Sequence, residues 1–191
     1  MIEPLIEHIK TFIPVSEALT NRLQDISDTI TIGKGKLLHK PNRVCENLYF
    51  IVSGLLRIYY KKDTKEITSS FSAEGEWITS IYGFMKNVPD NYYIQTLEPS
   101  ELIVINIQHL EKCFLDFPEM ERFGRLLVFN HFIQQNERIV SLQFHSAKER
   151  YAYFCKTAAN KLYRVPLGML ASHLGITQET LSRIRAEKIT F

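Results

Sequence analysis

The sequence contains no long hydrophobic run. None of its apolar stretches approaches the ~20 residues that a membrane-spanning helix needs. The N-terminus, MIEPLIEHIK, has no uninterrupted apolar stretch behind a basic start, so it lacks the pattern of a signal peptide. We therefore expect neither a membrane span nor a membrane partner.

Cysteine is scarce, with three residues in 191: Cys45, Cys113 and Cys155. They form no close pair in the sequence, and their odd number does not fit a disulfide framework. Free thiols are typical of the reducing cytosol, so we expect a cytoplasmic protein.

Motifs for catalysis and metal binding are missing. The six histidines show no ligand spacing. Metal sites of small β-barrel oxygenases and isomerases need His-x-His, a carboxylate and a further histidine, but the predicted β region has only His39. The sequence has no Gly-rich phosphate loop, nucleophile elbow or His-Glu-x-x-His motif. We predict that the chain is not an enzyme and has no catalytic or metal site.

Apolar residues are abundant, and the charges are unevenly distributed. The chain is 45% hydrophobic and 23% charged, which excludes a disordered protein. The net charge of +2 divides into two parts: residues 145–191 hold 8 Lys and Arg against 3 Asp and Glu, whereas residues 1–144 hold 15 against 18. A basic C-terminal segment on an acidic body indicates a polyanionic partner, with chance clustering as the alternative.

The first two thirds of the chain predict two short helices followed by a β domain. The helices are separated by Pro14, and Ser16 is the expected N-cap of the second. Breaks every 8–12 residues and many β-branched and aromatic residues then favour an antiparallel sandwich or barrel. We expect strands near residues 29–32, 48–52, 55–60, 67–71, 92–96 and 102–107.

A long helix is expected from Pro118 to about Phe144. Its apolar residues cover more than one stripe, so one stripe can pack on the β domain and the rest needs a second partner. The same helix in another copy of the protein is the most economical partner. The alternative is a helix buried on all sides by its own chain.

A new helix begins after residue 145. Ser146 and Glu149 have the spacing of a capping box, and this helix is expected to run to about Leu162. Tyr151, Phe154 and Ala158 are then on its inner face.

Residues 167–185 (LGMLASHLGITQETLSRIR) have the pattern of a helix-turn-helix. Ala171 is the small residue where two helices cross, Gly175 supplies the positive φ of the turn, and Thr177 caps the second helix. The outward side chains include groups that contact base edges in a major groove: Gln178, Glu179, Ser182 and Arg183. The alternative is an ordinary helical hairpin with a solvated polar face.

Two motifs resemble the Crp/Fnr transcription regulators, in particular a short type found in Bacteroidetes-like bacteria. Residues 48–57 (LYFIVSGLLR) match a segment of their β-roll, and residues 163–166 (YRVP) followed by the helix-turn-helix ending in TLSRIR match their DNA-binding domain. The resemblance covers nearly the whole chain. It implies an α+β fold: an N-terminal antiparallel β-roll of the double-stranded β-helix or jelly-roll type with flanking helices, a long dimerisation helix and a C-terminal truncated winged helix-turn-helix.

The resemblance also implies domains, partners and a site. We expect an effector domain over residues 1–112, a dimerisation helix over 113–144 and a DNA-binding domain over 145–191. The implied partners are double-stranded DNA, a second copy of the chain and RNA polymerase. Gln178, Glu179 and Arg183 would occupy the base-reading positions. The full set of predicted DNA-binding residues is Thr177, Gln178, Glu179, Thr180, Ser182 and Arg183.

The effector region departs from the family pattern. Relatives that bind cyclic AMP have a Gly-Glu pair and, some ten residues later, Arg-Ser or Arg-Thr. Backbone amides and the arginine bind the phosphate, and the glutamate binds the ribose hydroxyl. Here Thr79-Ser80 stand at the first pair and Asp90-Asn91 at the second. A buried phosphate would lose its charge-assisted pair and face a carboxylate, so we do not expect cyclic AMP to bind in the usual manner. We predict Gly75, Thr79 and Ser80 as the polar lining of a pocket for an unidentified uncharged or cationic effector, and a protein active without effector is the alternative.

Two further alternatives stay open. The chain has no cysteine before Cys45, so it lacks the N-terminal cluster ligands of redox relatives, whereas the six histidines leave haem ligation open. Residues 189–191 end the sequence just past the helix-turn-helix, so most of the wing is expected to be missing. Fewer phosphate contacts would then weaken DNA binding. The chain could instead be a small-molecule sensor or interaction protein with a vestigial helix-turn-helix.

Overall fold

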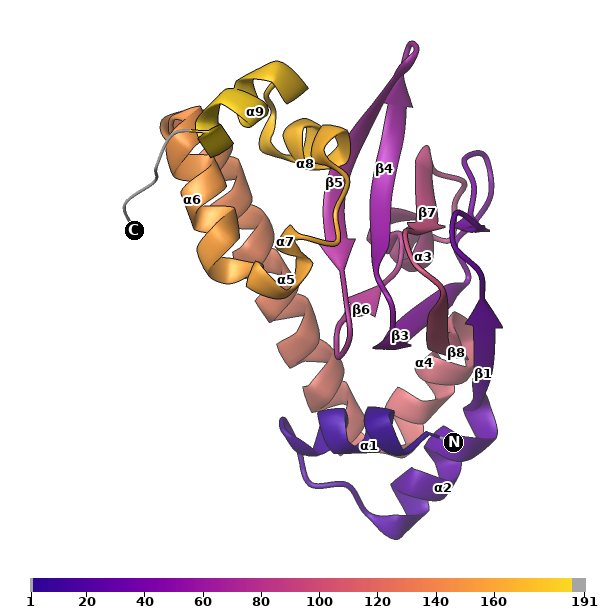
Figure 1. Ribbon diagram of the computed structural model, residues 1–191. Coiled ribbons are helices and arrows are strands. Elements are labelled where there is room, and N and C mark those ends of the chain that lie inside the picture. The colour runs from indigo at the N-terminus through magenta and orange to yellow at the C-terminus, as the bar shows by residue number, and fades with distance from the viewer. Residues whose placement is uncertain (1, 187–191) are drawn as a thin grey trace.

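The structure, a computed structural model, describes residues 2–186 and has a sandwich of two antiparallel four-stranded sheets (Figure 1). The strand order is β1-β8-β3-β6 in one sheet and β2-β7-β4-β5 in the other. The strands are β1 (Ser27–Ile32), β2 (Leu37–His39), β3 (Asn47–Ser53), β4 (Leu56–Lys62), β5 (Lys65–Ser72), β6 (Trp77–Ile78), β7 (Tyr92–Thr96) and β8 (Ser100–Asn106).

The prediction of an α+β fold with an antiparallel β domain is confirmed, and all six expected strands are present. The sequence did not reveal β2 and β6, because strands of three and two residues are too short to show alternation. The expectation about the wing falls on residues 187–191, which lie outside the described part of the chain.

Three helices close one end of the sandwich: α1 (Glu3–Lys10), α2 (Glu17–Ile26) and α4 (Ile107–Asp116). The hydroxyl of Ser16 accepts the backbone N–H of Leu19 at 3.1 Å, which confirms the predicted N-cap of α2. These helices, β3, β8 and the start of the long helix share one apolar core, which includes Leu5, Ile9, Leu23, Phe50, Ile103, Met120 and Phe123.

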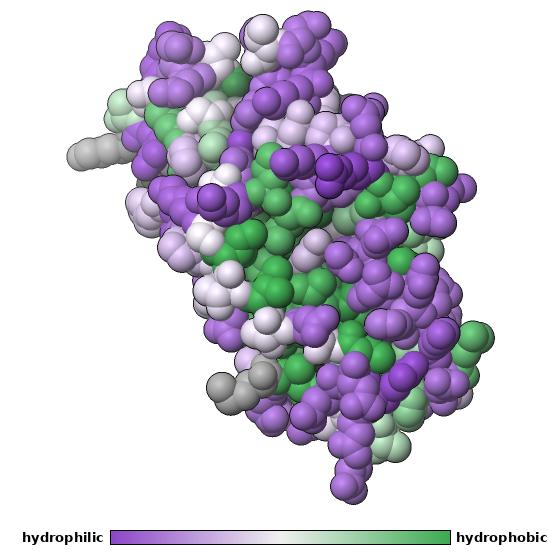
Figure 2. All heavy atoms as spheres, turned by 90° about the vertical axis from the view of Figure 1, so that its right-hand side faces the viewer, coloured by the Kyte–Doolittle hydropathy of each residue, from purple (hydrophilic) through white to green (hydrophobic). Residues whose placement is uncertain are grey.

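The core between the sheets reaches the surface at one edge. Figure 2 shows the face on the β1 side of the molecule, where hydrophobic side chains gather in a band between hydrophilic surroundings. Ile30, Ile32 and Leu38, from the edge strands β1 and β2, are partly buried against the core between the sheets. The edge strands therefore cover this core incompletely.

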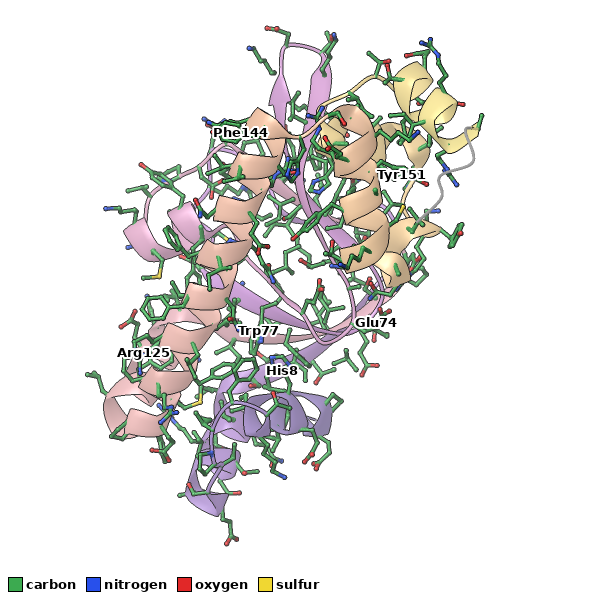
Figure 3. The ribbon with its side chains drawn as sticks, turned by 90° about the vertical axis from the view of Figure 1, so that its left-hand side faces the viewer. His8, Glu74, Trp77, Arg125, Phe144 and Tyr151 are labelled. Atoms are coloured by element: carbon green, nitrogen blue, oxygen red, sulfur yellow. The ribbon has the colours of Figure 1, made fainter. Side chains whose placement is uncertain are left out.

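The long helix α5 (Pro118–Phe144) has the predicted bounds. At 1.5 Å per residue its 27 residues span about 40 Å, and it runs along the molecule from the α1 end to the C-terminal helices (Figure 3). Met120, Phe123 and Ser141 are buried on its inner side. Its other side carries a row of exposed apolar residues: Phe132, Ile133, Ile139, Val140 and Phe144.

The capping box after α5 is confirmed. Ser146 N–H donates to Glu149 at 2.7 Å, and the hydroxyl of Ser146 accepts the Glu149 N–H at 3.3 Å. The single helix expected to residue 162 is wrong. The chain forms α6 (Ala147–Thr157) and α7 (Ala159–Leu162), because Ala158 leaves the helical region with φ −132° and ψ 38°.

The C-terminal helices α6 to α9 share an apolar core with the β-roll. One buried cluster contains residues of these helices together with four residues of the β-roll: Leu55, Phe71, Ala73 and Leu97. The helical members include Tyr151, Phe154, Leu170, Leu174, Leu181 and Ile184, and Val165 joins them from the connection between α7 and α8. The β-roll and the C-terminal helices are thus packed together, and the domain boundaries at residues 112 and 144 stay a prediction.

Ion pairs lie beside this shared core. Lys161 is buried, and its ammonium group donates to Glu76 at 2.6 Å and 2.7 Å. Arg164 binds Glu74 at 2.8 Å and Glu98 at 2.6 Å, and the Arg164 guanidinium lowers the pKa of Glu74 to about 2. Because the Arg164 pairs are partly exposed, they orient the helices more than they stabilise them.

The pH dependence of stability tests the packing around His173. This imidazole lies against the rings of Phe71 and Phe154, with centroids at 5.3 Å and 5.7 Å, while Arg138 donates to its backbone carbonyl at 2.9 Å. Burial, and then the charge of Arg138, lowers the pKa of His173 from 6.5 to about 3. The unfolded state therefore binds more protons, so stability falls as the pH drops below 6.5.

We expect the free energy of unfolding to fall by up to about 1.4 kcal/mol per pH unit from this residue, until the pH approaches the folded pKa. His173→Gln should remove this part of the slope. Urea unfolding from neutral pH to about pH 4 measures the difference between the two proteins. Equal slopes would contradict the assigned burial of His173.

Candidate functional site

The two helices α8 (Leu167–Leu174) and α9 (Gln178–Ala186) form the predicted helix-turn-helix. Gly175 ends α8 with φ 67° and ψ 35°, and Ile176 N–H returns to the carbonyl of Ala171 at 3.0 Å. The hydroxyl of Thr177 accepts the N–H of Thr180 at 3.2 Å, which confirms the cap of the second helix. The turn between α8 and α9 therefore has the positive φ at Gly175 and the cap at Thr177 that the sequence predicts.

The outer face of α9 is polar and exposed. Leu181 and Ile184 are buried on its inner side. Of the six predicted DNA-binding residues, Gln178, Glu179, Ser182 and Arg183 line one shallow hollow on the outer side. Thr177 and Thr180 lie at the helix start, where their hydroxyls are 3.1 Å apart.

Glu179 and Arg183 do not form the intrahelical ion pair that their spacing permits. The N–H of Glu179 and the hydroxyl of Thr177 lower the pKa of the Glu179 carboxyl, which keeps it ionised at the helix start. Within residues 2–186 the Arg183 guanidinium has no ion-pair partner. The outer face of α9 thus presents a free guanidinium beside amide, carboxylate and hydroxyl groups.

Two arginines that the sequence did not single out hold the C-terminus of α8. Arg150 on α6 donates to the carbonyl of Leu174 at 2.8 Å, and Arg138 on α5 donates to that of His173 at 2.9 Å. Both carbonyls lie in the last turn of α8, where cations are favourable. These bonds fix the helix-turn-helix on α5 and α6. They connect residues more than 20 positions apart, beyond the reach of local sequence patterns.

A cleft of about 990 Å³ lies between the β-roll, α5 and α6. Its lining is mainly apolar, and it includes two of the three predicted effector residues, Gly75 and Thr79, but not Ser80. Trp77 and His8 also line it, and the Trp77 indole N–H donates to the His8 imidazole at 3.0 Å (Figure 3). Burial lowers the pKa of His8, which favours the neutral form that accepts this bond.

The polar groups that were predicted to line the pocket are buried or hydrogen-bonded to the backbone of the protein itself. The hydroxyl of Thr79 donates to the carbonyl of Asn47 at 2.9 Å. The hydroxyl of Ser80 is buried without a hydrogen-bond partner, directly before α3 (Ile81–Lys86). Gly75, with φ 77°, donates its N–H to the carbonyl of Ile51 at 2.9 Å.

Asp90 is buried, and only one of its two carboxylate oxygens has hydrogen-bond partners among the described residues. One oxygen accepts His39 Nε2 at 2.9 Å and the backbone N–H of Tyr92 at 2.8 Å. The other lies against Gly83 on α3, where an added Cβ would be only 2.3 Å away. The position where the sequence analysis expected the family's phosphate-binding arginine therefore holds an internal acid, and a phosphate bound beside it would meet a negative charge.

Comparison with known proteins agrees with this architecture. Residues 29–116 match the family described as the cyclic nucleotide-binding domain. The structure of a CooA mutant from Carboxydothermus hydrogenoformans is 20% identical, with a TM-score of 0.72 over 90% of this chain and 79% of that one. FixK2 from Bradyrhizobium japonicum is 16% identical, with a TM-score of 0.73 over 84% and 83%. The chain has the Crp/Fnr fold.

A third structure with the Crp/Fnr fold is a transcriptional regulator of the Crp/Fnr family from Eubacterium rectale, described as putative in its published name. It is 20% identical, with a TM-score of 0.70 over 89% of this chain and 82% of that one. No curated protein sequence matches the chain.

The described residues contain neither a metal cluster nor a membrane span. Within residues 2–186, no group of three or more His, Cys, Asp or Glu side chains could hold a metal ion. Among the helices of the same range, none is long and apolar enough to cross a bilayer.

Titration with cyclic AMP tests the electrostatics of the Asp90 region. We expect calorimetry to show no saturable binding at physiological concentration, because residues 75–91 contain no arginine and the family pattern predicts the phosphate near the position of the buried Asp90. Cooperative thermal unfolding of the same sample checks that the protein is folded. A micromolar dissociation constant would contradict the charge argument.

Proposed function

We propose that the chain is a homodimeric transcription regulator that binds double-stranded DNA sequence-specifically through α9. The observation that carries this proposal is the outer face of α9, where the free Arg183 guanidinium lies beside Gln178 on a helix-turn-helix. The Crp/Fnr fold and the basic residues 145–191 support it. In a helix-turn-helix the second helix lies in the major groove.

Each outer side chain has a matching base edge. Arg183 can donate two hydrogen bonds to guanine O6 and N7, and Gln178 can bind the N6 and N7 of adenine. Glu179 can accept the amino group of cytosine, and Ser182 can bind either kind of edge. Thr177 and Thr180, at the start of α9, are placed for the DNA backbone, since helix N-termini are favourable for phosphate.

The exposed face of α5 supports a dimer. Phe132 is 68% exposed, Ile133 54% and Ile139 53%. Their spacing places a continuous apolar stripe outside the protomer, which a second α5 can cover by helix-to-helix packing. Two copies of α9 about 34 Å apart would then match half-sites one helical turn apart.

In this proposal residues 1–112 form the effector domain, 113–144 the dimer helix and 145–191 the DNA-binding domain. The proposed effector of the mainly apolar cleft is an uncharged or cationic molecule. RNA polymerase is the proposed further partner at the promoter.

Selection of bound sequences from random DNA tests the DNA contacts. Arg183→Ala should relax the preference at one position of each half-site, because a bidentate Arg–guanine pair contributes about 1–3 kcal/mol of discrimination. Arg185→Ala is the matched control: Arg185 is also exposed on α9, but it lies outside the hollow that Arg183 lines. An unaltered preference in Arg183→Ala would remove this residue from the base contacts. Wild-type protein without preference for any DNA would instead indicate a sensor with a vestigial helix-turn-helix.

Sedimentation velocity tests the dimer. The wild-type protein should be a dimer at micromolar concentration, whereas Phe132→Glu with Ile133→Glu should give monomers or insoluble protein, because four carboxylates would meet in the interface. Tyr163→Glu is the control, since this side chain is 86% exposed and lies outside α5. A stable wild-type monomer would contradict the proposed interface.

A further inference from the structure

The hairpin formed by β4 and β5 projects at the end of the molecule where α9 lies (Figure 1). Asp63 and Thr64 connect the two strands, and Asp63 has the positive φ of 55° that tight hairpin turns require. All residues from 60 to 66 are exposed. The sequence of the tip, KKDTKE, places three lysines within five residues.

Two of these lysines face each other without a counter-charge. Lys62 lies directly opposite Lys65 in the antiparallel ladder of β4 and β5. Lys61 has Glu66 at 3.7 Å, but within residues 2–186 neither Lys62 nor Lys65 forms an ion pair. Like charges directly opposite each other destabilise a β pair, and an anionic partner would remove this repulsion.

The hairpin is fixed to the helix-turn-helix through Ser172. The hydroxyl of this residue on α8 accepts the backbone N–H of Thr68 at 3.0 Å and donates to the carbonyl of Glu66 at 2.9 Å. Both partners belong to β5, the edge strand of its sheet. The lysine tip begins next to this anchor, so it is positioned relative to α8 and α9.

We propose that Lys62 and Lys65 bind the phosphate backbone of DNA beside the segment that α9 contacts. The inference rests on the proposed DNA binding and adds a contact that lies outside residues 145–191. A DNA duplex is long and uniformly charged, so a duplex held by α9 extends past the same end of the molecule. The lysine ammonium group is a point charge on a flexible stem, which suits a phosphate oxygen rather than a base edge.

The test compares two double variants that remove the same charge. Lys62→Gln with Lys65→Gln removes the two lysines of the hairpin tip. Lys10→Gln with Lys112→Gln removes two exposed lysines from α1 and α4, at the opposite end of the molecule (Figure 1). The dissociation constant is measured over a range of salt concentrations, on the selected sequence and on an unrelated duplex.

The hairpin variant should bind both duplexes more weakly than wild type while keeping the same ratio between them, because phosphate contacts carry no sequence information. The slope of log affinity against log salt should decrease by about 0.9 for each phosphate that is no longer neutralised, hence by about 3–4 for two lysines in each copy of a dimer. The control variant should keep the wild-type slope. Thermal unfolding of the hairpin variant should be no lower than that of wild type, since a repulsion is removed.

The outcomes separate the two proposals. If wild type binds DNA and the hairpin variant has the same slope as the control, the lysines only keep the hairpin solvated and the inference is wrong while DNA binding stands. A change in sequence preference with an unchanged slope would also overturn it. Wild-type protein that binds no DNA overturns the proposed function, and the inference with it.

Discussion

The apolar core shared by the β-roll and the C-terminal helices determines where every functional group of the molecule lies. Leu55, Phe71 and Leu97 are buried against Phe154 and Leu170 of the helices. Burial of one such side chain contributes about 1.5–3 kcal/mol, so this contact outweighs the partly exposed ion pairs beside it. This packing sets the direction of α9 and the position of the β4–β5 hairpin. It also sets the walls of the cleft.

Helix α5 serves several of these features at once. Its first turns pack in the core at the α1 end, its middle lines the cleft, and near its C-terminus Arg138 holds the last turn of α8. The opposite side of the same helix carries the exposed apolar row. A shift of α5 along its axis would therefore change the cleft and the support of the helix-turn-helix together.

The sequence predicts those features that depend on residues within about one helical turn of each other. Gly175 with Thr177, Ser146 with Glu149, and the strand alternation are local, and each formed as expected. The break at Ala158 did not follow from local propensity, since alanine is a strong helix former. The break precedes Lys161, whose ammonium group binds Glu76, a residue that is 85 positions away in the sequence. A tertiary contact therefore overrides the local helix preference of alanine there.

The same distinction applies to the sites. The outer face of α9 could be predicted because helical spacing alone separates its buried and exposed residues. The effector region could be predicted only in part. The contact between His39 and Asp90 joins residues 51 positions apart, and that between Trp77 and His8 joins residues 69 apart. No periodicity connects such pairs, so the sequence identified Asp90 as a departure without revealing its partner.

The contact between Asp90 and Gly83 has an evolutionary consequence. An arginine at position 90 would leave His39 without its carboxylate, and its longer side chain would meet the backbone of α3 where the present oxygen already excludes a Cβ. The intermediate on a single-mutation path toward a phosphate-binding site therefore loses stability before it gains a ligand. Several residues would have to change together, so a single substitution at position 90 would not give a phosphate-binding site.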